Sequence, residues 1–205
     1  MKILHLFHNL MNLYGEYANT LALKRELENR GVSVELEKQS IGDKIDFSDA
    51  DFIYIGSGTE KNQKVALEAL KPLCEELREA MKRGAIVLAT GNSFEMFGKK
   101  ITDKNGAEFE GLGFFDFTTT ESDKRTVTDS LCEFNGSEII GFVNKASEIF
   151  GITKPFFTVK QGAGNNQNET ATEGIIDGNF YGTHIIGPLL IRNKAVAEYF
   201  ANLLK

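Results

Sequence analysis

The sequence predicts an α/β protein with a doubly wound, mostly parallel sheet that is flanked by helices and extended by β-hairpins. In the first half, short apolar runs alternate with longer stretches of helical period, which is typical of parallel strands covered by helices on both faces. In the second half, two-residue turns separate pairs of short strands, which indicates hairpins. The chain has 205 residues, and we expect residues 1–205 to form a single domain.

The chain begins with a predicted strand, helix and strand. Lys2–Phe7 is an apolar run of strand length, and Glu16–Arg30 has the helical period. Gly31 follows in the position where glycine commonly ends a helix. Val32–Leu36 then predicts the second strand, so the chain returns to the sheet after one helix.

The third strand leads directly into a glycine-rich turn. Phe52–Ile55 predicts this strand, and Gly56-Ser57-Gly58-Thr59 follows it at once. The next stretch, Asn62–Arg83, has a helical period. We expect Pro72 to start a second helix within it, because proline is tolerated in a first turn and is disruptive further inside.

The fourth strand is expected to lie at the centre of the sheet. Ala85–Ala89 is the most apolar strand-length run, and Thr90-Gly91-Asn92-Ser93 and a short helix follow it. Enzymes with α/β folds expose a nucleophile at such a sharp strand-to-helix turn and use the next backbone amide as an oxyanion donor. We therefore expect the functional site at this turn, residues 90–93, which we call the elbow.

The remaining chain predicts hairpins and a closing helix. Asn135-Gly136 and Gly178-Asn179 are two-residue turn signals between apolar runs. The predicted strands on either side of them are Arg125–Phe134, Glu138–Phe142, Gly174–Asp177 and Phe180–His184. Ala195–Leu204 predicts an amphipathic helix capped by Asn193, and Gly162–Thr172 predicts a loop.

Composition excludes several classes of function. The formal net charge is −6, with 41% hydrophobic and 25% charged residues, and the basic residues are spread along the chain. We therefore expect neither a nucleic acid nor an anionic membrane as the main partner. The apolar runs are too short to span a bilayer and the start MKILHLFHN does not have the pattern of a signal peptide, so we expect no membrane insertion and a cytoplasmic location.

The metal-binding residue types are dispersed. Cys74 and Cys132 are the only cysteines, and His5, His8 and His184 the only histidines. None of them falls in a spacing typical of a metal site, so we expect no metal and no cofactor. Both cysteines are interpreted as ordinary thiols outside the elbow.

Two turns at predicted strand ends are candidate binding sites, because helix N-termini and free amides converge beyond the carboxyl ends of parallel strands. Gly56-Ser57-Gly58 would present amides to an anion, although a purely structural tight turn is equally compatible with the pattern. The elbow carries Gly91 at its apex. Glycine has no side chain that could attack a substrate.

Several segments together resemble the CobB/CobQ-like group of class I glutamine amidotransferases, and among these the amidotransferase subunits of bacterial lipid II isoglutaminyl synthase. The resemblance covers nearly the whole chain and implies a flavodoxin-like class I amidotransferase fold. The segments are Leu10–Glu16 (LMNLYGE), Ile55–Glu60 (IGSGTE), Glu110–Asp116 (EGLGFFD), Gly164–Asn166 (GNN), Thr172–Gly174 (TEG) and Gly182–Leu190 (GTHIIGPLL).

The resemblance also implies that both catalytic positions are substituted. The family's elbow resembles AVCGGYQLLG, and Ala89–Gly98 (ATGNSFEMFG) places Gly91 at the cysteine. A GTYLHGP-like segment carries the family's histidine, and reading GTHIIGP against it places Ile186 there. Glutamine hydrolysis needs the thiolate to form a thioester and the histidine to move its proton, so the resemblance implies loss of the covalent route.

Other residues bear on what remains of the site. Ser93 and His184 are candidate substitutes for the catalytic pair, against the alternative of a capping serine and a packed histidine. Arg125 matches an arginine of the family and is a candidate partner for the carboxylate of a glutamine-like ligand, or else a solvated arginine. Asn92 replaces a glycine after the cysteine and would narrow or reline the pocket.

These observations leave three functions open. The first is a catalytically inactive amidotransferase-like subunit that docks on a Mur-ligase-like protein, since the family supplies ammonia to a synthase. The second is an active amidotransferase or hydrolase with a rebuilt site, cobyric acid synthase-like or based on serine and histidine. The third is a module that binds glutamine or a related small molecule between Gly56–Thr59 and Gly91–Ser93.

Overall fold

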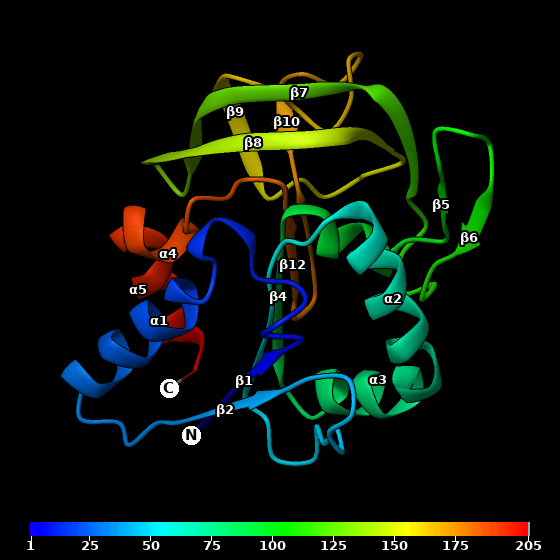
Figure 1. Cartoon of the computed structure of the whole chain (residues 1–205). Coiled ribbons are helices and arrows are strands. Elements are labelled where there is room, and N and C mark those ends of the chain that lie inside the picture. The colour runs from blue at the N-terminus through cyan, green and yellow to red at the C-terminus, as the bar shows by residue number, and fades with distance from the viewer. Residues whose placement is uncertain (205) are drawn as a thin grey trace.

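A computed structural model describes residues 1–204 and arranges them as a helix-flanked sheet with a second sheet laid across one end (Figure 1). The strands of the first sheet are β1 (Lys2–Leu6), β2 (Glu35–Gln39), β3 (Phe52–Ile55), β4 (Ile86–Thr90), β11 (Ile175–Asp177) and β12 (Phe180–Thr183). Those of the second are β5 (Lys100–Thr102), β6 (Glu108–Glu110), β7 (Thr118–Phe134), β8 (Ser137–Phe150), β9 (Phe157–Gln161) and β10 (Thr172–Glu173).

The helical elements are α1 (Ala18–Asn29), α2 (Glu60–Leu70), α3 (Cys74–Lys82), α4 (Leu189–Arg192) and α5 (Lys194–Leu203), with short 3-10 segments η1 (Leu13–Gly15), η2 (Lys71–Leu73) and η3 (Gly91–Phe97). The first sheet has the order β11-β12-β4-β3-β1-β2. Its strands are parallel except for β11, which pairs antiparallel with β12. The predicted fold class is confirmed, and β4 lies inside the sheet as its apolar sequence predicts.

Alternating side chains of the strands bury against opposite layers of helices. In β3, Phe52 and Tyr54 pack in one apolar cluster with residues of α1 and α5, and Ile53 and Ile55 pack in another with residues of α2 and α3. Figure 1 shows α1, α4 and α5 on one side of the sheet and α2 and α3 on the other. Both faces are covered, which explains why these strands are nearly continuous in apolar character.

The second sheet is built on one long hairpin. Asn135 and Gly136 both have positive φ, at 50° and 77°, as the two-residue turn predicted there requires. β7 and β8 are much longer than predicted, and they extend across the carboxyl end of β4, above η3 (Figure 1). This places the hairpin over the elbow.

Several predicted boundaries and one predicted cap differ from the structure. The second strand is Glu35–Gln39 rather than Val32–Leu36, because pairing with β1 begins at Lys2 opposite Glu35. The long predicted helix divides at Lys71–Leu73, where Pro72 interrupts it as expected. Asn193 precedes α5 but its side chain makes no cap hydrogen bond, so that expectation is wrong.

The Asn193 side chain instead ties the closing helices to the hairpin. Its Oδ1 accepts from the amide of Ile140 at 2.8 Å, and its Nδ2 donates to the carbonyls of Ile140 and Leu189.

Within residues 1–204, no helix is both long and apolar enough to cross a membrane.

Candidate functional site

The elbow keeps the backbone conformation of a strained turn but has no room for a side chain at its apex. Gly91 has φ +63°, in the left-handed region, directly after β4. A Cβ atom at position 91 would lie 2.4 Å from both Cβ and Oγ of Ser57. The Ser57 side chain thus occupies the space that a nucleophile at the elbow would need.

In the glycine turn next to the elbow, Gly56-Ser57-Gly58, the amide of Gly58 already has a hydrogen-bond partner. The amide of Gly58 donates to Oδ1 of Asn92 at 3.0 Å. The carbonyl of Asn92 accepts from Nε2 of Gln63 at 2.6 Å, which anchors the residue to α2. Asn92 therefore lies across the amide that a developing oxyanion would use. Gly56, the other predicted glycine, packs against the backbone of Met11, whose carbonyl oxygen would lie 2.6 Å from a Cβ there.

A cavity of about 190 Å³ lies beside the elbow, and we call it the elbow pocket. Of the predicted ligand-binding residues, Ser57, Gly58, Asn92 and Arg125 line it. The remaining lining residues are Leu13, Tyr14, Thr59, Glu60, Glu95, Glu121, Asn144, Lys145, Ala146 and Ser147. Four of the five predicted ligand-binding residues thus lie around one cavity, and the residues of β8 and Glu121 of β7 complete its wall without having been predicted.

Arg125 is held by neighbours of its own. Its guanidinium forms an ion pair with Glu60 and donates to Oδ1 of Asn144 at 3.0 Å. Asn144 in turn donates to the hydroxyl of Tyr14 at 2.8 Å. A ligand carboxylate would have to compete with Glu60 for this arginine.

Ser93 and His184 are not joined by a hydrogen bond. The Ser93 hydroxyl is fully buried and lies 2.9 Å from the carbonyl oxygens of both Ile55 and Thr90. His184 places Nε2 2.9 Å from Oε1 of Glu95. The serine hydroxyl thus has the environment of a turn-stabilising group, and neither residue lines the elbow pocket.

His184 belongs to a buried polar cluster beneath the pocket. Its backbone amide donates to Oε1 of Glu173 at 2.7 Å, and the Thr183 hydroxyl donates to Oε2 of the same carboxylate. Glu95 accepts from Ser147 Oγ at 2.5 Å and from Gln63 Nε2 at 2.7 Å. Burial raises the pKa of the Glu173 carboxyl. The cluster connects η3, β8, β10 and the end of β12.

Lys145 closes the same region from β8. Its Nζ donates to the carbonyls of Gly164 and Asn165 at 2.7 and 2.8 Å. Burial lowers the pKa of this ammonium group. The predicted loop 162–172 is therefore anchored by buried hydrogen bonds near Lys145, although it is irregular in backbone.

The position assigned to the family's histidine is apolar and packed. Ile186 is 1% exposed, and its backbone exchanges hydrogen bonds of 3.0 and 3.2 Å with Phe142 of β8. An isoleucine cannot carry a proton, so this position offers no acid or base. Neither cysteine compensates, because burial raises the pKa of the Cys132 thiol to about 11, and Cys74 lies in α3 against the carbonyl of Leu112.

A third buried carboxylate, that of Glu16, supports the elbow. Glu16 Oε2 accepts from the hydroxyls of Tyr54 and Thr90, and Oε1 accepts from the amide of Gly187 at 3.1 Å. Burial raises the pKa of Glu16. This residue joins the LMNLYGE segment to β3, to Thr90 at the start of the elbow, and to the GTHIIGPLL segment.

Sequence reasoning assigned no role to Glu16, Glu95, Lys145 or Glu173. Three of them stand in segments that were singled out, Glu16 in LMNLYGE, Glu95 in the elbow segment and Glu173 in TEG. An acidic residue inside an otherwise apolar or glycine-rich segment was the available signal. Within residues 1–204, no three or more His, Cys, Asp or Glu side chains are grouped to hold a metal ion.

Comparison with known proteins finds a matching family model and several relatives. A family model described as the CobB/CobQ-like glutamine amidotransferase domain matches residues 2–194. The lipid II isoglutaminyl synthase (glutamine-hydrolyzing) subunit GatD of Staphylococcus aureus is 30% identical over 97% of this chain and 82% of its own length. The subunit of the same name from Streptococcus pneumoniae is 30% identical over 96% and 77%.

Cobyric acid synthase of Limosilactobacillus reuteri is 28% identical over 62% of the chain, which covers 27% of that enzyme. Among solved structures, PurLQS from Thermotoga maritima superposes with a TM-score of 0.62 at 14% identity, covering 99% of this chain and 97% of the other. A crystal structure of a glutamine amidotransferase superposes with a TM-score of 0.64 at 11% identity, covering 98% of each chain. These two likenesses establish the fold.

Proposed function

The chain belongs to the CobB/CobQ-like glutamine amidotransferase family, and we propose that it acts as an amidotransferase-like subunit that does not itself hydrolyse glutamine. The observation that carries this proposal is the packing of Ser57 against Gly91. The side chain of Ser57 fills the space that a thiol at position 91 would need, because its Cβ and Oγ lie 2.4 Å from where a Cβ of residue 91 would be. The nucleophile is absent and its place is occupied.

Two further contacts support the same proposal. The amide of Gly58 is bonded to Asn92, so an oxyanion donor is engaged before any substrate arrives. Ile186 stands where the family's proton shuttle would be and packs on the hairpin. The positions of the nucleophile, the oxyanion donor and the base are therefore all occupied by groups that cannot carry out glutamine hydrolysis. Three such changes together are expected of a subunit that no longer catalyses the reaction.

The role that remains is that of a subunit. Two relatives that match nearly the full chain are named as subunits of a synthase that modifies lipid II. By analogy we assign this chain to a cytoplasmic complex with a Mur-ligase-like protein. In that complex it would contribute its folded surface, while ammonia would come from another source.

The test is glutaminase activity of the purified chain, alone and with its candidate Mur-ligase-like partner. We expect ammonia release from glutamine to equal that of the heat-denatured protein in both cases. An active glutaminase added to the same mixture shows that the assay detects ammonia.

The contrary outcome is that the chain releases ammonia from glutamine, that this release is lost in Ser93→Ala, and that it is unchanged in Ser122→Ala. Ser122 is exposed on β7 and serves as the matched control. That result would replace the proposal with a hydrolase rebuilt on Ser93.

A further inference from the structure

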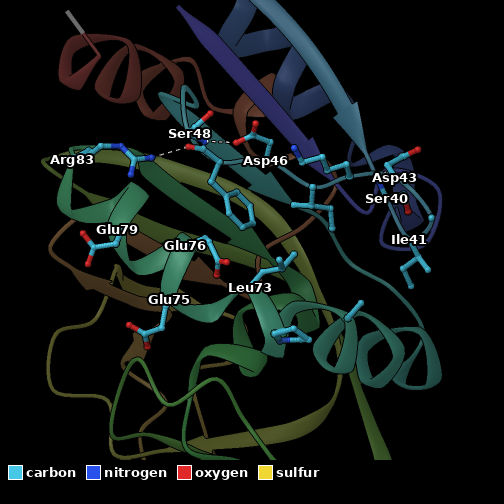
Figure 2. Close-up of a pocket in the computed structure, with 16 residues that line it drawn as sticks. Ser40, Ile41, Asp43, Asp46, Ser48, Leu73, Glu75, Glu76, Glu79 and Arg83 are labelled. Atoms are coloured by element: carbon cyan, nitrogen blue, oxygen red, sulfur yellow. Dashed lines mark hydrogen bonds between the residues drawn. The ribbon is translucent and has the colours of Figure 1, made fainter.

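A groove of about 840 Å³ lies away from the elbow, between the loop that follows β2 and the segment η2–α3 (Figure 2). It shares no lining residue with the elbow pocket. Its volume is within the range of about 300–1,000 Å³ that is common for ligand sites. We call it the acidic groove, for the residues described next.

The loop that forms one wall is held in place by hydrogen bonds. Nη2 of Arg83 donates to the carbonyl of Phe47 at 2.9 Å, and the amide of Asp46 donates to Oε1 of Gln39 at 2.9 Å. The amide of Ser40 donates to Oδ2 of Asp43 at 2.8 Å. The groove is thus formed in advance, which lowers the entropic cost of binding.

The floor of the groove is apolar. Phe47 is buried in the main core, and Ile45, Ala69 and Leu73 are partly buried against it. Ile41 lies at the rim and is 50% exposed. A ligand that fits this floor would remove these side chains from water, which favours an apolar group.

The rim carries a net negative charge. The lining includes five carboxylates, Asp43, Asp46, Glu75, Glu76 and Glu79, and two basic residues, Lys44 and Arg83. The resulting net charge of −3 is half of the −6 of the whole chain. The guanidinium of Arg83 is engaged by the loop carbonyl. On α3, Glu79 pairs with Lys82 at 2.7 Å and Glu75 lies 3.6 Å from Arg78, whereas within residues 1–204 Glu76 has no ion-pair partner. Exposed pairs of this kind contribute little and leave the carboxylates open to a competing cation.

We propose that the acidic groove binds a segment of a partner protein in which an apolar side chain is flanked by lysine or arginine. The apolar floor takes the central side chain, and the carboxylates on both walls take the flanking cations. Figure 2 shows Glu75, Glu76 and Glu79 along α3, and Asp43 and Asp46 on the facing loop. Charges arranged along two walls suit an extended segment with cations on either side of its apolar anchor.

The same charges disfavour other ligands. Phosphate groups of nucleic acids or anionic lipids would meet the carboxylates and be repelled. The inference is independent of the elbow, because it uses no residue of the elbow pocket and needs no glutamine chemistry. It specifies a second binding region whether or not the chain hydrolyses glutamine.

Fluorescence anisotropy with labelled model peptides tests the proposal on the full chain. The probe is a short fluorescein-labelled peptide that alternates leucine with lysine. One comparison peptide has glutamate in place of lysine, and another has serine in place of leucine. We expect the leucine–lysine peptide to bind saturably and both comparison peptides to bind about tenfold more weakly or worse.

Charge-reversal variants locate the binding. Glu76→Lys/Glu79→Lys is expected to weaken the leucine–lysine peptide by about tenfold, whereas Glu133→Lys/Glu138→Lys on the β7–β8 hairpin, which changes the net charge equally, is expected to leave it unchanged. Ile41→Ser should weaken binding without affecting the fold, since Ile41 is half exposed.

Three outcomes would overturn the proposal: no saturable binding, equal weakening by the two charge-reversal pairs, or equal binding of the leucine–glutamate peptide. None of these variants alters the elbow, so the glutaminase assay reports on the proposed function separately.

Discussion

The elbow pocket and the acidic groove differ in how their polar side chains are used. In the elbow pocket, of about 190 Å³, Asn92, Glu95 and Arg125 bond to other residues of the protein. In the acidic groove, of about 840 Å³, the carboxylates of Glu75, Glu76 and Glu79 are on exposed residues at the rim. The side chains of the elbow pocket are bonded to residues from distant segments, whereas the exposed glutamates of the acidic groove form ion pairs with neighbours on α3, Glu75 with Arg78 and Glu79 with Lys82.

This difference also predicts how the two regions respond to substitution. At the elbow, Gly91 has a left-handed conformation, and the polar side chains around it are hydrogen-bonded to one another or to the backbone. A polar cluster of this kind stabilises the fold only while all of its members stay paired. The acidic groove has no such internal network among its glutamates, so its side chains can be changed at little cost to the fold.

The largest expected effect compares the same substitution in the two regions. Glu95→Ala leaves the side chains of Ser147, Gln63 and His184 without their buried acceptor, and we expect a loss of about 3–5 kcal/mol in the free energy of unfolding. Glu76→Ala in the acidic groove should change it by no more than about 0.5 kcal/mol. Urea unfolding measures both, and similar losses would remove the distinction.

Acid should destabilise the fold through the buried side chain of His5. Burial lowers the pKa of His5 from 6.5 to about 4. Between pH 6.5 and about pH 4, His5 is protonated in the unfolded chain but stays neutral in the folded chain. The stability from neutral His5 is therefore complete above pH 6.5 and falls by about 3 kcal/mol as the pH drops towards 4.

Unfolding free energies measured across this pH range check the expectation. His5→Leu should make the dependence of the unfolding free energy on pH shallower. An unchanged slope in His5→Leu would show that other groups cause the acid sensitivity.

A smaller loss of stability tests whether Ser57 occupies the space above Gly91. Gly91→Cys introduces a Cβ against Ser57 and a side chain at positive φ, and we expect it to destabilise the fold by about 2 kcal/mol. Adding Ser57→Gly should recover the part due to crowding, so the two changes should not be additive. Simple additivity in thermal or urea unfolding would contradict the contact between the two residues.

Local sequence predicted much of the framework. The apolar character of Ala85–Ala89 predicted an interior strand, Asn135-Gly136 predicted a hairpin turn, and Pro72 predicted a break between two helices. These features depend on the preferences of a few adjacent residues, such as the positive φ that a two-residue turn requires. The elbow position was predicted for the same reason, since a strand, a glycine and a short helix follow one another directly.

The contents of the site depended on contacts between distant segments. Asn92 bonds Gly58 across 34 positions, and His184 lies against Glu95 across 89. No local pattern predicts such pairs, so Ser93 and His184 looked like candidate partners although each is hydrogen-bonded elsewhere. Likewise the side chain of Asn193 bonds to Ile140 of β8 instead of capping its helix, because the edge of β8 offered both a donor and an acceptor at Ile140.

The sequence by itself therefore determined the parallel core, its hairpins and a glycine at the elbow, since periodicity and turn chemistry act over a few residues. Only the tertiary structure decided that Ser57 fills the space above Gly91 and that acidic residues of a loop and a helix line the same groove. The physical reason is that steric exclusion and charge pairing act between atoms a few ångströms apart, whatever their separation along the chain.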